Sequence, residues 1–130
     1  LMVNELAMRP HNSGHWTMNG SVTSQFEQHL RAVLDYPLGD TRAVAPVTVM
    51  ANVLGAARTP AMAMDERVHH LFGRIPDAHV HLYGKQERPG RKIGHVNVVG
   101  NDLDVVRERA ERAALWLSQA VWTTGRSAHD

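Results

Sequence analysis

Apolar residues recur at steps of three and four along the last third of the chain. After Asn101 and Asp102 the repeat runs through Leu103, Val106, Ala110, Ala113, Leu117 and Val121. Charged residues lie between them, at Arg107, Glu108, Glu111 and Arg112. Because an α-helix turns once in about 3.6 residues, this spacing puts the apolar side chains on one face and the charges on the other. It predicts a long amphipathic helix that closes the fold.

Two shorter helices are predicted upstream. Ser24 and Glu27 have the spacing of a capping box, and the apolar residues that follow are Phe26, Leu30, Val33 and Leu34. Pro37 and Gly39 should end that helix. Asp65 is expected to cap a further short helix, whose apolar positions are Val68, Leu71, Phe72 and Ile75.

Four segments have the pattern of β-strands. Residues 3–7 form a short candidate strand that ends before Pro10, and alternation would put Glu5 and Arg9 on one face. The others are residues 47–54, which are rich in β-branched side chains, 79–83 and 93–99. Strands and helices alternate in short pieces, so the expected class is α+β.

Composition narrows the functional classes. The chain has 130 residues, 43% of them apolar, which suits one ordinary globular core. The 14 basic and 13 acidic residues leave no charge excess for nucleic-acid or membrane partners, and no apolar run has the length of a membrane span. A cytoplasmic protein is therefore expected. There is no cysteine, which excludes disulfides and thiolate sites, whereas nine histidines are many for this length.

Three groups of residues could carry chemistry. His11 and His15, and likewise His79 and His81, have spacings that a metal site could use, although hydrogen-bonded or solvated histidines are the more common outcome. Four cations surround Pro89-Gly90: Lys85, Arg88, Arg91 and Lys92. They indicate either a solvated hairpin tip or an anion clamp. Neither a phosphate-binding glycine motif nor a serine-hydrolase elbow is present.

Two long signatures carry a resemblance to a known family. The run "NELAMRPHNSGHWT", followed by "TSQFEQHLRAVLDYPLGDT", and the downstream run "HLYGKQERPGRKIGHVN" resemble the C-terminal third of the ATP-grasp 5-(carboxyamino)imidazole ribonucleotide synthases. The resemblance covers residues 3 to about 100 well and the closing helix more loosely. The related glycinamide ribonucleotide formyltransferase has His-Asp-Thr-Gly where this chain has "HNSG", which favours the carboxylating family. Met8 departs from the proline usual there.

The resemblance implies an ATP-dependent ligase of purine biosynthesis. Its substrates would be 5-aminoimidazole ribonucleotide, bicarbonate and ATP, with carboxyphosphate formed on the way and Mg²⁺ (or Mn²⁺) as the metal. Asn4 and Glu5 match the nucleotide site, and Glu5 matches the metal carboxylate. Arg9 matches the catalytic arginine that steadies the transferred phosphoryl group or bicarbonate.

Substrate residues also follow from the resemblance. His11, Asn12 and Ser13 match the loop that faces the imidazole ribonucleotide. Its 5′-phosphate would be gripped by the cations already noted, with Lys85 and Arg91 as the main pair and Arg88 and Lys92 as weaker candidates. These groups should meet Glu5 and Arg9 in one cleft. The resemblance leaves His69, His70 and His129 without a role.

The expected organisation has two parts. Residues 1–40 would supply the last strand, loop and helix of an ATP-grasp domain, and residues 41–130 a small β-barrel-like lobe with its terminal helix. The ATP-binding lid and the first metal carboxylate should lie upstream, so we expect a fragment that is inactive alone and a homodimeric parent. The rival hypothesis is a stand-alone phosphate- or nucleotide-binding module without catalysis.

Overall fold

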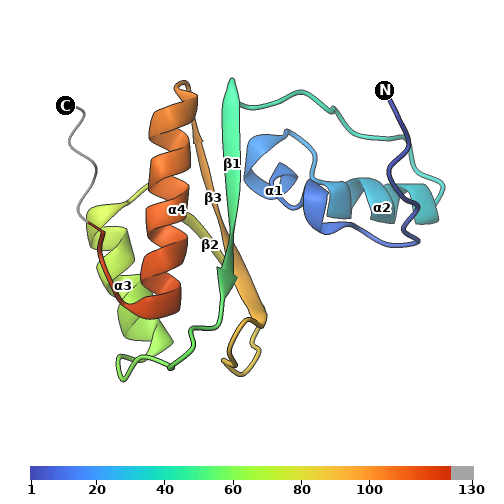
Figure 1. The fold of residues 1–130 in the computed structure, drawn as a ribbon. Coiled ribbons are helices and arrows are strands. Elements are labelled where there is room, and N and C mark those ends of the chain that lie inside the picture. The colour runs from blue at the N-terminus through green and yellow to red at the C-terminus, as the bar shows by residue number, and fades with distance from the viewer. Residues whose placement is uncertain (124–130) are drawn as a thin grey trace.

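The computed structural model describes residues 1–123 and has one three-stranded sheet with helices on both faces (Figure 1). Helices α1 and α2 lie on one side of the sheet and α3 and α4 on the other. In chain order the elements are η1 (Asn12–Gly14), α1 (Thr17–Gly20), α2 (Gln25–Val33), β1 (Val47–Leu54), α3 (Met64–Arg74), β2 (His79–Leu82), β3 (Lys92–Gly100) and α4 (Leu103–Gln119). The α+β class is confirmed. None of the helices among these residues is long and apolar enough to cross a bilayer.

Strand β3 is the centre of the sheet, whose order is β1-β3-β2. Both neighbours run antiparallel to it: Val47 of β1 pairs with Gly100, and His81 of β2 pairs with His95. The expected barrel-like closure is wrong in this detail, because the sheet is open. A barrel would require β1 and β2 to pair with each other, and among residues 1–123 both pair only with β3.

The two faces of β3 are both buried but differ in chemistry. Val96 and Val98 belong to the apolar core, which α4 covers with Leu117 and its alanines. The intervening residues His95 and Asn97 point to the opposite face, where α1 contacts the strand. Alternation along one strand therefore separates an apolar core from a buried polar layer.

The predicted helices α2 and α4 are confirmed. Ser24 accepts a hydrogen bond from the backbone N–H of Glu27 at 3.2 Å, as a capping box requires. Asp102 caps α4 through the N–H groups of Asp104 and Val105. The apolar stripe of α4 is buried from Val106 to Leu117, whereas Leu103 is half exposed and Val121 lies beyond the helix end.

Two local expectations differ from the structure, and one short helix was not expected. Residues 3–7 are exposed and form no strand, because no segment of the described chain pairs with them. Helix α3 begins at Met64 with Ala63 as its cap, so Asp65 lies in the first turn instead of capping it. The short helix α1 was not expected from the pattern.

A stacked tryptophan pair fixes the segment after α4. The rings of Trp116 and Trp122 have centroids 4.4 Å apart and an interplanar angle of 9°. The Arg74 guanidinium lies 4.7 Å from the Trp122 centroid. Trp122→Ala should lower the free energy of unfolding by about 1 kcal/mol, measured by urea titration, and remove the near-ultraviolet circular dichroism of the pair. Val121→Ala is the control; an equal loss there would contradict a specific role of the stack.

Candidate functional site

Three of the four cations noted in the sequence lie on the connection between β2 and β3, and the fourth, Lys92, is the first residue of β3; residues 84–92 are here termed the basic loop. It connects β2 to β3 and contains a tight turn in which Arg91 N–H donates to Arg88 O at 3.0 Å. Pro89 and Gly90 occupy the central positions, and Gly90 has a φ of +70°. Proline followed by a left-handed glycine is the residue pattern of a type II turn. The sequence therefore specifies the shape of this loop.

The basic loop is anchored to the rest of the fold. Gly55 donates to Arg91 O at 2.8 Å and accepts from Gly90 N–H at 2.9 Å. Glu87 forms an ion pair of 2.5 Å with Arg67, whose side chain is buried in α3. A freely solvated hairpin tip would lack such contacts, so the loop geometry favours the anion-clamp hypothesis.

The two lysines of the basic loop both lie near one aromatic ring. Lys85 Nζ lies 5.5 Å and Lys92 Nζ 5.7 Å from the centroid of Tyr83. Burial, and secondarily the charge of Lys85, lower the pKa of Lys92. An anion placed between these ammonium groups would offset their mutual repulsion. Arg88 and Arg91 are exposed, and each donates to Gln86.

One residue of the N-terminal signature contacts the basic loop, and its neighbours contact one another. Lys92 donates to the side-chain oxygen of Asn12. His11 Nε2 lies 2.7 Å from Glu5 Oε1, and His11 Nδ1 accepts from the Ser13 N–H at 3.2 Å. Because Nδ1 accepts, Nε2 carries the proton and donates to Glu5. Segments 80 residues apart in the sequence thus form one polar surface.

Comparisons with known proteins identify the chain. The ATP-grasp domain profile matches residues 1–26, and the profile of the phosphoribosylaminoimidazole carboxylase C-terminal domain matches residues 48–109. The chain is 72% identical over 129 residues to an N5-carboxyaminoimidazole ribonucleotide synthase of Mycobacterium tuberculosis (strain ATCC 25618 / H37Rv), covering 99% of this chain and 30% of that protein. A Corynebacterium ammoniagenes enzyme of the same name is 57% identical over 128 residues, covering 98% of this chain and 31% of that protein.

Solved structures agree with the sequence matches. The synthetase of Thermotoga maritima has a TM-score of 0.71 and 45% identity, covering 87% of this chain and 31% of that one. The synthase of Aspergillus clavatus in complex with ADP and 5-aminoimidazole ribonucleotide has a TM-score of 0.66 and 32% identity, covering 85% and 30%. The chain belongs to the N5-carboxyaminoimidazole ribonucleotide synthase family. It spans about 30% of the length of the relatives it matches.

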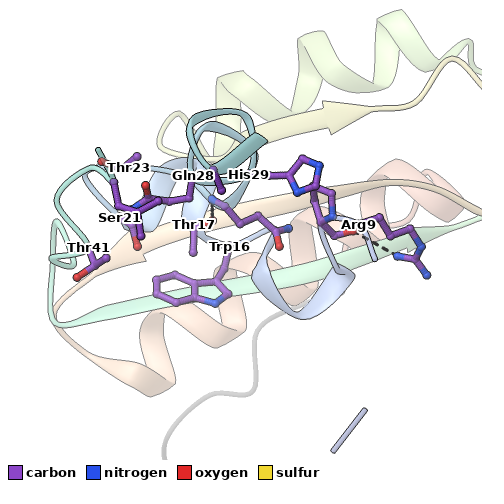
Figure 2. Close-up of a pocket in the computed structure, with 12 residues that line it drawn as sticks. Arg9, Trp16, Thr17, Ser21, Thr23, Gln28, His29 and Thr41 are labelled. Atoms are coloured by element: carbon purple, nitrogen blue, oxygen red, sulfur yellow. Dashed lines mark hydrogen bonds between the residues drawn. The ribbon is translucent and has the colours of Figure 1, made fainter. Parts of the chain in front are cut away.

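Arg9 lines a cavity to which no residue of the basic loop contributes. Its guanidinium donates to Pro10 O at 3.3 Å, and its side chain lines a cavity of about 550 Å³ beside α2 (Figure 2). Trp16, Thr17 and His29 line the same cavity. Asn4 is exposed on the segment that was expected to be a strand. Convergence of Glu5 and Arg9 with Lys85 and Arg91 in one cleft therefore stays a prediction for the whole synthase.

Sequence reasoning missed a buried polar cluster, which joins Tyr83, His95 and His81 to Asn19 and Asn97. Tyr83 Oη lies 2.6 Å from His95 Nδ1, and the His81 ring stacks on His95 with centroids 4.6 Å apart. His81 Nε2 lies 2.7 Å from the Asn19 oxygen, which also accepts from Asn97 at 2.9 Å. His79 is exposed, whereas His81 is a hydrogen-bonded histidine of the sheet.

Burial sets the protonation state of this cluster. It lowers the pKa of His95 to about 4, with His81, His15 and Lys92 adding to the shift. Burial also raises the pKa of Tyr83. At neutral pH a protonated Tyr83 hydroxyl and a neutral His95 therefore share a hydrogen bond, which holds the Tyr83 ring near Lys85 and Lys92. The apolar run around His95 was the signal in the sequence, since a histidine inside a buried strand needs a partner.

A second missed residue is Arg67. It lies on the buried stripe of α3, between Met64 and Leu71, and its side chain is 1% exposed. A charged residue in register with an apolar helical stripe was the available signal. His69 and His70 lie on the exposed side of α3, and His129 lies outside the described residues.

Proposed function

We propose that the chain is the C-terminal part of an ATP-dependent ligase that carboxylates 5-aminoimidazole ribonucleotide with bicarbonate. The observation that carries the proposal is the contact between Lys92 and Asn12, which joins the anchored basic loop to the His11–Ser13 signature. The named relatives and the ribonucleotide complex of the Aspergillus clavatus synthase support it. We place the division between the two parts of the chain near residue 40.

The basic loop would bind the 5′-phosphate of the ribonucleotide. Lys85 and Arg91 are the main ligands in this proposal, with Arg88 and Lys92 beside them. The anchored turn holds these cations before the ligand arrives, which reduces the entropy lost on binding. Asn12 and Ser13 would then face the imidazole and its amine.

Glu5 and Arg9 would serve the phosphoryl transfer. A bicarbonate oxygen attacks the γ-phosphorus of ATP and ADP leaves; the substrate amine then takes up the carboxyl group and phosphate is released. Arg9, with Asn4 nearby in the sequence, would face the oxyanions of this step. Its exposure in this chain suits a partner from the remaining length of the synthase.

The donor set fits Mg²⁺ only as part of a larger site. Among residues 1–123, no group of three His, Cys, Asp or Glu side chains is arranged to hold a metal ion. Magnesium commonly uses one or two protein carboxylates together with substrate phosphates, and Glu5 offers one exposed carboxylate. When bound, the ion would neutralise charge on the transferred phosphoryl group. Accordingly, we propose that this chain alone does not turn over ATP. Separately, we propose that the whole enzyme is a cytoplasmic homodimer.

Kinetics of the full-length enzyme test this division of roles. Glu5→Gln should lower kcat about tenfold through weaker metal binding, with little change in the ribonucleotide KM. Arg91→Ala should raise the ribonucleotide KM about tenfold with kcat nearly unchanged, because it removes phosphate binding. Equal effects of both variants on both parameters would contradict the assignment. Ribonucleotide-dependent ADP release by the 130-residue chain alone would contradict the proposed dependence on the rest of the enzyme.

A further inference from the structure

A buried arginine of α3, Arg67, contacts the basic loop through its side chain. Arg67 is buried in α3, and its guanidinium donates both to Leu117 O of α4 and to Glu87 Oε1 of the loop. Its own carbonyl accepts from the Trp116 indole at 2.7 Å. Arg67 is thus held at its backbone and at its side chain by α4. These contacts restrict the orientation in which the Arg67 guanidinium meets Glu87.

The Arg67–Glu87 ion pair carries a desolvation cost that an apolar contact at the same place would not have. Desolvating two charges offsets most of their attraction, so an apolar pair of similar volume would serve stability as well or better. One further polar atom of each partner, Arg67 Nε and Glu87 Oε2, is buried without a hydrogen-bond partner. The ion pair therefore suggests a role in setting the conformation of the basic loop and the charge that the loop presents.

Glu87 is the single acidic residue of the basic loop, with Lys85 two positions before it and Arg88 directly after it. Its side chain is 17% exposed and its carboxylate contacts Arg67, whereas Lys85, Arg88 and Arg91 are exposed. Turned outward, the same carboxylate would repel a phosphate at the cations. The ion pair both anchors the loop and withdraws its only negative charge.

We propose that Arg67 is a positioning residue of the ribonucleotide site: it holds Glu87 inward, so that the basic loop presents cations alone to the 5′-phosphate. This inference rests on the function proposed above. It assigns phosphate affinity to a residue that does not touch the ligand. It also predicts that the harm of losing Arg67 comes largely from the carboxylate left behind.

The test is a double-variant comparison in the full-length enzyme. Arg67→Met should raise the ribonucleotide KM about tenfold, and Glu87→Gln about threefold, with kcat within twofold for each. The double variant should return to about threefold, because the unpaired carboxylate is gone. Glu111→Gln, an exposed carboxylate on α4, is the matched control and should leave the ribonucleotide KM unchanged.

The outcomes separate the two proposals. A double variant that is no better than Arg67→Met, or losses in kcat equal to those in KM, would overturn the positioning role and indicate a structural one. If Lys85→Ala leaves the KM unchanged, the phosphate-clamp function itself fails. Should Arg67→Met not fold, Glu87→Gln decides alone, and a KM equal to that of the parent overturns the inference.

Discussion

Lowering the pH from 7.5 to 4.5 should remove about 2.5 kcal/mol of folding stability through His95 alone. Its pKa is about 4 in the folded chain and 6.5 as the ordinary value. The unfolded state therefore binds more protons between pH 6.5 and 4, and stability falls as the pH drops through this window. Above pH 6.5 the contribution is complete, and below pH 4 no further loss arises from this group. His15 and His81, whose pKa values burial also lowers, should add to the slope.

Urea unfolding at a series of pH values measures the effect. His95→Gln should flatten the slope between pH 4 and 6.5, whereas His69→Gln, on the exposed side of α3, should leave it unchanged. The ring resonances of His95 in the unmodified chain give an independent check that needs no variant. A midpoint near 6.5 for those resonances would refute the prediction.

Gly55→Ala should destabilise the chain by about 3 kcal/mol, because an added methyl group has no space. A Cβ at this position would lie 2.0 Å from the carbonyl oxygen of Arg88. Relief requires the basic loop to move away, which breaks its two backbone hydrogen bonds to Gly55. Urea unfolding of the chain measures the loss, and exchange of the backbone amides of residues 55 and 90, which donate the two hydrogen bonds, should rise in the same variant.

Gly73→Ala is the matched control for that substitution. Nothing lies within 4 Å of a Cβ built at Gly73, which is an exposed position of α3. Alanine there should raise stability by about 0.5–1 kcal/mol through helix propensity. Destabilisation of both variants to the same degree would show that glycine flexibility, and not the contact with Arg88, explains the Gly55 result.

Elements with a local signal could be predicted from the sequence. The capping box at Ser24, the β-branched run of β1 and the stripe of α4 each specify their element within a few residues. Residues 3–7 have a strand pattern too, but a strand exists only when another segment supplies its hydrogen bonds. Barrel closure failed as an expectation for the same reason, since strand patterns do not say which edges pair.

The candidate site also has features that the sequence predicts and features that it does not. The cations of the basic loop could be read from composition, and the resemblance assigned them a ligand. The contacts that hold the loop could not: the pairing of Glu87 with Arg67 spans 20 residues, and that of His95 with Tyr83 depends on the strand register. Long-range polar partners follow from tertiary packing, which no periodicity encodes.

The central place of β3 has a consequence for biosynthesis. In the part of the chain that the structure describes, both ladders of the sheet include this strand, which begins at residue 92, whereas β1 ends at residue 54. During synthesis, β1 and β2 leave the ribosome before β3 is available to pair with them. Their backbone hydrogen-bonding groups therefore stay unpaired until β3 and then α4 have been translated. Nascent chains stalled before residue 92 should therefore depend on chaperones, and collapse of the whole lobe should follow in one late step.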